Sequence, residues 1–169
     1  MGWNTSAVFV ETTDPAEALD GVGLTGLRVT EENVPWDTAT SGMEVGFVFT
    51  ARSGAWTQIW DPELRVVGGL IGSAPTLDTS SRVLAVVFSS VSSTYGFAWF
   101  EGGQLVRRVV YVDGAVAEQA GDLLPVEATM EFPEWGPDED FVFEVVKTLT
   151  EYDDSDPAAP YRRHELPDW

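Results

Sequence analysis

Few side chains in this sequence suit nucleophilic or zinc-dependent catalysis. The chain has no cysteine and a single histidine, His164, which lies in an Arg-Arg-His-Glu segment near prolines. A Ser-His-Asp triad needs a histidine base, and protein zinc sites are built mainly from cysteine and histidine. The G-x-S-x-G motif of many hydrolases is also missing from the sequence. The sequence therefore predicts no catalytic residue and no zinc centre.

One glycine pattern matches a phosphate-binding motif. Residues 21–26 read Gly-Val-Gly-Leu-Thr-Gly, which fits G-x-G-x-x-G. In a dinucleotide site this motif follows a strand and opens a helix. Here it follows a predicted helix and enters a loop, so the negative end of the helix dipole would face a phosphate. We interpret the glycines as a helix stop and expect no cofactor.

Carboxylates are abundant enough for acid–base chemistry or cation binding, because the chain has 28 Asp and Glu residues. Three groups are close in sequence: Asp61 with Glu63; Glu127 with Glu131 and Glu134; and Asp153 with Asp154 and Asp156. None has the spacing of a calcium-binding loop. At this density such groups arise by chance. We interpret them as solvated surface charge and expect no metal site.

Arg108 is the side chain best suited to recognise a ligand. The glycine pair at 102–103 predicts a two-residue turn, and counting from it pairs Phe97 with Arg108. Tyr95 and Trp99 share this strand face. Two interpretations are open. The first is an anion-recognising arginine in an aromatic pocket, and the second is a structural arginine at the margin of the core.

Two tryptophans fall in proline-containing segments predicted as loops. Aromatic side chains in such loops can anchor a protein partner. The alternative is that they belong to the core, as we expect for most of the seven tryptophans. The candidate partner-binding residues are Trp36 and Trp135.

Alternating apolar residues and tight-turn signals predict the elements that position these side chains. Strands are expected at 4–10, 43–52, 55–60, 83–89, 94–101, 104–112 and 115–119. Gly102-Gly103 and Asp113-Gly114 join the last three strands into a meander. Helices are expected at 15–21, 74–81, 125–130 and 139–150, and residues 24–42 are expected to form a loop.

These elements predict an α+β fold. The expected architecture is an antiparallel sheet built from hairpins and a three-stranded meander, with a few helices packed mainly on one face. The length of 169 residues fits one domain. We expect that domain to span residues 1–152, and residues 153–169 to form a polar, proline-containing C-terminal tail.

The charge of the chain restricts its partners. The net charge is −19, and residues 113–169 hold 16 acidic and 3 basic side chains. Phosphates repel such a surface, so nucleic acids and anionic membranes are disfavoured. A basic protein is the favoured partner. Solubility or a halophilic source would also explain the acidity.

Localisation and source follow from composition. Apolar runs such as Val83–Phe88 are too short to span a bilayer, and the first residues lack the features of a signal peptide. We therefore expect a cytoplasmic protein. Eight of the nine basic residues are arginine, which is typical of a bacterium with GC-rich codons.

Parts of the sequence resemble uncharacterised actinobacterial protein families. The segments Tyr95–Phe100, Leu105–Arg108 and Leu124–Pro125 are similar to one such pattern, and Met1–Ser6 followed by Asp14–Leu19 is similar to another. The similar segments are strands and turns. The resemblance therefore implies a fold and implies no site, since these families have no assigned activity.

Three functional hypotheses follow. The sequence favours a non-enzymatic, acidic, cytoplasmic protein-binding module of the inhibitor or immunity type. The alternative is a small-molecule anion-binding or enzymatic site around Arg108 with aromatic walls. The third is a homodimer formed through an exposed sheet face that carries Phe100, Leu105, Val109, Tyr111 and Val116.

Overall fold

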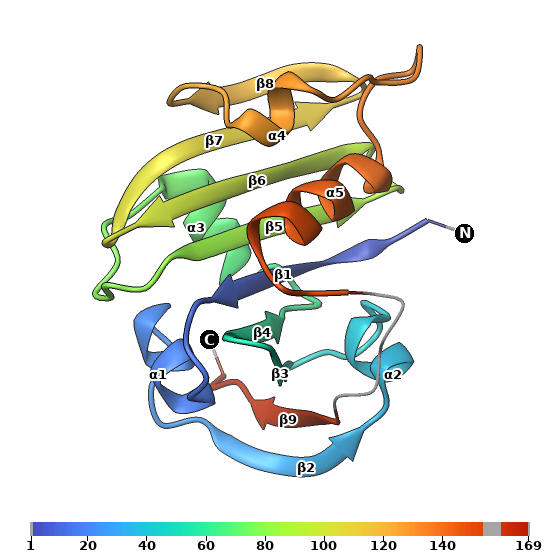
Figure 1. Cartoon of the computed structure of the whole chain (residues 1–169). Coiled ribbons are helices and arrows are strands. Elements are labelled where there is room, and N and C mark those ends of the chain that lie inside the picture. Colours follow the sequence, from blue (N-terminus) through green and yellow to red (C-terminus); the bar gives the residue numbers. More distant parts are fainter. Residues whose placement is uncertain (1, 154–159, 169) are drawn as a thin grey trace.

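The computed structural model describes residues 2–153 and 160–168, and its strands form one antiparallel sheet. The order across the sheet is β2-β9-β3-β4-β1-β5-β6-β7-β8 (Figure 1). The strands are β1 (Asn4–Val10), β2 (Arg28–Val34), β3 (Phe47–Ser53), β4 (Trp56–Trp60), β5 (Val83–Ser89), β6 (Thr94–Glu101), β7 (Gln104–Val112), β8 (Ala115–Ala120) and β9 (Tyr161–Glu165). The helices are α1 (Pro15–Gly21), α2 (Trp36–Thr40), α3 (Val67–Ser73), α4 (Pro125–Ala128) and α5 (Glu139–Leu149). The predicted α+β fold is confirmed.

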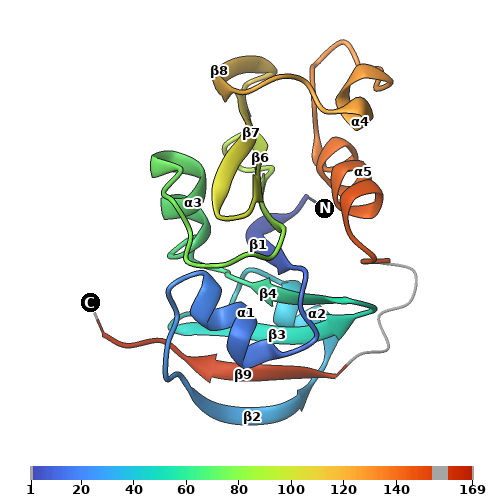
Figure 2. The ribbon, with the colours of Figure 1, turned by 60° about the vertical axis from the view of Figure 1, so that its left-hand side comes forward.

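Helices cover both faces of this sheet (Figure 2). On β1, Phe9 belongs to a core that includes Val142 of α5, with α2 and α4 on the same side. The neighbouring Val8 belongs to a second core that includes Leu70 of α3, with α1 on that side. The expectation of helices mainly on one face therefore needs correction. Strands β1 and β5 are buried along nearly their whole length, so both faces must be covered.

The β6–β7 hairpin has the predicted glycine turn and an unpredicted bulge. Beside the turn the pairing is as expected, but beyond it Trp99 pairs with Arg107 and Phe97 pairs with Val109. One extra residue in β7 shifts every later pair by one position. The predicted pairing of Phe97 with Arg108 is therefore wrong. Arg107 takes the place on the aromatic face, and Arg108 points to the opposite side.

Several elements form where the sequence did not predict them, among them helix α2, which lies within residues 24–42. Strand β2 lies in the segment expected to be a loop, and α3 ends before residues 74–81, where a helix was expected. Asp61 explains where α3 begins. Its buried carboxylate accepts hydrogen bonds, 2.7 to 3.1 Å long, from the backbone N–H groups of Arg65, Val66 and Val67. These bonds satisfy donors that the helix itself leaves free.

The predicted domain boundary at residue 152 is wrong, because strand β9 lies beyond it and belongs to the sheet. This strand lies inside the sheet, between β2 and β3, instead of in a polar tail. Tyr161 is 1% exposed, and its hydroxyl donates a hydrogen bond of 2.7 Å to Oε1 of Gln58. The N–H of Leu166 donates to the carbonyl oxygen of Gly46 at 2.9 Å. The C-terminal segment therefore belongs to the folded unit.

His164 on β9 is a buried titratable group. It is 5% exposed, and its Nε2 lies 2.8 Å from Oγ1 of Thr50. Burial, and secondarily the charge of Arg162, lowers the pKa of His164 below its usual 6.5. As the pH falls through about 6.5, the unfolded chain takes up a proton that the folded chain excludes. The free energy of unfolding should therefore fall as the pH falls through this range.

Replacing His164 with glutamine is expected to flatten this pH dependence. Between about pH 7.5 and 5.5 the wild type should lose up to about 1.4 kcal/mol per pH unit through this group. Urea unfolding of both proteins at several pH values measures the difference. If the free energy of unfolding changed equally with pH in the wild type and in His164→Gln, the placement of His164 in the interior would be contradicted.

Candidate functional site

Arg108 is bound to the end of helix α3 instead of facing the aromatic rings. Its Nη1 donates hydrogen bonds to the carbonyl oxygens of Ile71 and Gly72, at 2.9 and 3.0 Å. Carbonyl groups at a helix C-terminus carry partial negative charge, so a guanidinium stabilises them. The same nitrogen lies 3.9 Å from the carboxylate of Glu118. The structure therefore does not bring together the anion site predicted around Arg108.

The aromatic residues predicted as walls of that site are core side chains. Tyr95, Phe97 and Trp99 are 7%, 0% and 3% exposed. Phe97 packs against Phe141 of α5, with 6.1 Å between ring centroids. The Tyr95 hydroxyl donates to Glu139 at 3.2 Å, and burial together with this carboxylate raises the pKa of Tyr95 to about 12. Tyr95 and Phe97 therefore help to hold α5 on the sheet.

Arg107, placed on the aromatic face by the bulge, forms a buried ion pair with Glu127 of α4. Their side chains are 2% and 4% exposed. Nε and Nη2 of Arg107 donate to the two carboxylate oxygens at 3.0 and 2.8 Å, and Nη1 donates to the carbonyl oxygen of Gly121 at 3.0 Å. The N–H of Leu124 donates to the same carboxylate at 2.7 Å. The ion pair holds α4 against the sheet. Because both side chains are buried and hydrogen-bonded within the protein, neither is accessible to a ligand.

The two candidate tryptophans differ in exposure. Trp36 begins α2, packs edge-on against Trp3 at 5.7 Å, and donates from Nε1 to the Tyr152 hydroxyl at 3.2 Å. Its expected place in a loop is therefore wrong, and it belongs to the core margin. Trp135 lies in the turn before α5 and is 72% exposed, with Nε1 3.5 Å from Asp138. Of the two, Trp135 is available as an anchor.

The acidic groups noted in the sequence are mostly structural. Asp61 caps α3, and burial raises the pKa of its carboxyl group. Glu63 pairs with Arg65 at 3.2 Å. Asp154 and Asp156 lie outside the described residues. Within 2–153 and 160–168, no group of three or more Asp, Glu or His side chains is arranged to hold a metal ion.

The sheet face proposed for a homodimer is not one surface. The bulge places Phe100 and Leu105 with the core under α3, and Val109 and Tyr111 with the core under α5. Phe100 and Val109 are fully buried. Val116, on the edge strand β8, is 48% exposed. The dimer predicted through these five residues therefore needs correction, because they do not share an accessible face.

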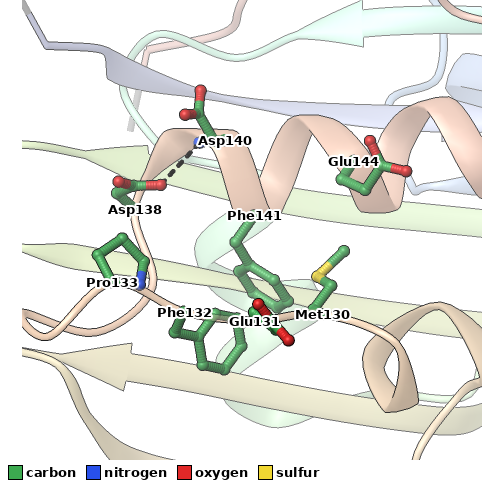
Figure 3. A pocket seen from close by; sticks show the side chains of 8 residues that line it. All are labelled: Met130, Glu131, Phe132, Pro133, Asp138, Asp140, Phe141 and Glu144. Atoms are coloured by element: carbon green, nitrogen blue, oxygen red, sulfur yellow. Dashed lines mark hydrogen bonds between the residues drawn. The ribbon is translucent and has the colours of Figure 1, made fainter.

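A pocket of about 250 Å³ lies between the start of α5 and the segment that leads to it (Figure 3). Figure 3 shows side chains from the two segments facing each other across it. Its lining residues are Met130, Glu131, Phe132, Pro133, Asp138, Asp140, Phe141 and Glu144.

Aromatic rings form the floor of this pocket. Phe132 packs edge-on against Phe141, with 5.4 Å between ring centroids. The centroid of the Tyr111 ring, on β7, lies 5.8 Å from that of Phe132 and 5.6 Å from that of Phe141. Phe141 is 4% exposed, whereas Phe132 is 41% exposed. The buried rings fix the position of Phe132, which then presents apolar and π surface to solvent.

Four acidic residues line this pocket together with the aromatic rings: Glu131, Asp138, Asp140 and Glu144. Asp138 caps α5 by accepting from the N–H of Asp140 at 3.1 Å, and a helix N-terminus favours negative charge at both positions. Glu144 lies further along α5, and Glu131 lies on the opposite segment (Figure 3). No basic residue lines the pocket. An aromatic face beside several carboxylates can bind a cation through both charge and π interactions.

Sequence reasoning missed this pocket. It placed Glu131 among surface charges and assigned no role to Phe132. A usable signal was present, however. Between Arg108 and Lys147 the chain has ten acidic residues and no basic one, and this stretch includes the Phe132–Pro133 step and Trp135. An excess of acidic residues attracts cations, and nearby aromatic rings can add cation–π contacts.

Comparison with known proteins adds no relative. No protein-family model, curated protein or solved structure matches this chain. The resemblance to actinobacterial families therefore stays a prediction. Among the described helices, none is both long and apolar enough to cross a bilayer.

Proposed function

We propose that this protein is a non-enzymatic, acidic, cytoplasmic binding module that masks a basic partner protein, as an inhibitor or immunity protein does. The pocket beside α5 then takes an arginine or lysine side chain of that partner. The observation that carries the proposal is the half-exposed Phe132 ring within a set of four carboxylates. The net charge of −19 supports it, since such a field steers a basic protein toward the surface.

The size of the pocket supports a single side chain over a larger ligand. Its volume of about 250 Å³ is below the usual range of small-molecule sites. Trp135, 72% exposed and bonded to Asp138 at the pocket wall, supplies a second aromatic contact for a partner. Tryptophan is enriched among the residues that dominate binding energy at protein interfaces.

A small probe tests the pocket directly. N-acetyl-arginine methylamide, titrated at low ionic strength, is expected to shift the NMR signals of Phe132 and Phe141 in a saturable way. The neutral citrulline analogue, which has nearly the same shape, should not. The double variant Glu131→Gln/Glu144→Gln is expected to weaken binding by about tenfold, because each lost charge removes roughly 0.5–1 kcal/mol at an exposed site.

The control is Asp20→Asn/Asp78→Asn. Both carboxylates line a different acidic hollow, near α1, so the change in net charge is the same. This variant should bind the arginine probe like the wild type. If citrulline binds equally well, or if the control loses as much affinity as the pocket variant, the pocket does not recognise a cation.

A further inference from the structure

The two edge strands of the sheet differ in how they are protected. Strand β2 carries charged side chains and pairs with β9 through two register shifts, features that discourage further pairing. Strand β8 reads Ala-Val-Ala-Glu-Gln-Ala, and five of its six residues are exposed. It has no proline, glycine or lysine, and its one irregularity is a bulge at Ala117. Within the described part of the chain, β8 pairs with β7 alone.

An unpaired, exposed strand edge is a template for another strand. The charge near β8 indicates the chemistry of that strand. Asp113 and Asp122 flank β8, and Glu118 lies within it, with its carboxylate 3.9 Å from Nη1 of Arg108. In a second copy of this chain the edge would be equally acidic, so charge opposes self-pairing. A basic, extended segment would have the complementary charge.

The surroundings of β8 connect it to the proposed binding surface. The backbone of Trp135 and Gly136 lies against Gly114 in the β7–β8 turn, so the exposed Trp135 ring stands at one end of the edge. Phe132, on the pocket floor, contacts Tyr111, and Tyr111 pairs with Val116 of β8. Figure 2 shows β8 at the upper margin of the sheet, with α4 on one side.

We infer that β8 binds an extended, arginine- or lysine-containing segment of the partner by strand addition, next to Trp135 and the pocket. This inference rests on the proposed function and adds its mode of recognition. Backbone hydrogen bonds to β8 supply affinity, and alternating basic side chains reach the carboxylates and the Trp135 ring. The edge strand is therefore part of the interface.

Two peptides of equal charge separate strand addition from charge attraction. The first alternates arginine and threonine, and the second alternates arginine and proline. Proline lacks an N–H and disfavours pairing within a sheet. The arginine–threonine peptide is expected to bind at least about tenfold more tightly at low ionic strength, and to slow hydrogen exchange of β8 amides. Equal affinity of the two peptides would overturn strand addition.

A variant of the protein provides the matching test. Ala117 is the bulged residue, so Ala117→Pro should leave the β7 ladder in place, which the urea midpoint checks. It is expected to weaken binding of the arginine–threonine peptide about tenfold, whereas Ala117→Thr should not. If Ala117→Pro fails to fold, hydrogen exchange of wild-type β8 with and without peptide decides, and unchanged exchange refutes the inference.

The remaining outcomes separate the two proposals. If the arginine–proline peptide binds equally well and Glu131→Gln/Glu144→Gln weakens it, the pocket stands and strand addition fails. If neither arginine peptide binds at low ionic strength, both proposals fail. If sedimentation of the free protein shows a dimer that Ala117→Pro dissociates, β8 pairs with a second copy, and the basic segment is the wrong occupant.

Discussion

Replacing Arg107 with methionine is expected to lower the free energy of unfolding by about 3–5 kcal/mol. The change leaves Glu127 charged, with a side chain 4% exposed and without its guanidinium partner. It also removes the donor to the carbonyl oxygen of Gly121. A buried carboxylate without a partner costs far more than a lost surface contact, and most domains have only about 5–15 kcal/mol of stability.

Chemical denaturation of a small set of variants tests this expectation. Glu127→Gln should cost a similar amount, because it leaves the arginine charge buried. The double variant Arg107→Met/Glu127→Met should recover part of the loss, since no buried charge is left. Arg52→Met on the exposed side of β3 is the control, with an expected change of about 0.5 kcal/mol or less. A loss for Arg107→Met as small as that of the control would contradict the buried ion pair.

Removing residues 154–169 is expected to abolish cooperative folding, a larger effect than any single substitution. The deletion takes β9 from between β2 and β3 and leaves backbone groups of both strands without partners. It also removes Tyr161 from the core and His164 from Thr50. Truncating one buried aromatic side chain alone costs about 3–5 kcal/mol, so the sum approaches the whole stability of a domain.

Circular dichroism and urea unfolding of the chain 1–153 measure this effect. The control deletes only residues 167–169, beyond β9, and should unfold with nearly the wild-type midpoint. A synthetic peptide of residues 160–169, added to the chain 1–153, is expected to restore the transition in a concentration-dependent way. A chain 1–153 that unfolds cooperatively at the wild-type midpoint would show that β9 contributes little.

The sequence predicted local structure better than it predicted register. The two glycine-containing turns of the meander, the start of α5 at Glu139 and strand β1 are all where the pattern placed them. These features depend on a few neighbouring residues. The bulge in β7 does not, because it forms where Arg107 meets Glu127, which is 20 residues further along the chain. A prediction made from the hairpin sequence alone cannot include that contact, because Glu127 lies outside the hairpin.

Strand β9 and the pocket were missed for a related reason. The Tyr-Arg-Arg-His-Glu segment is too polar to read as an interior strand, and it becomes one because β2 and β3 leave a space between them. The pocket needs Phe132 to pack on Phe141 and on Tyr111 of β7, and no pattern of neighbouring residues predicts either contact. Of the residues singled out in advance, Trp135 stays as a candidate, because its exposure depends on a local turn.

The place of β9 in the sheet also sets an order of events during synthesis. His164 of β9 contacts Thr50 of β3 across 114 residues, so the part of the sheet that contains β3 cannot close until the ribosome has made residues 161–165. Strands β1 and β5 to β8 can assemble earlier, since their partners lie closer in the chain. Until then the nascent protein exposes the unfilled side of β3, and that interval is when chaperones would be needed most.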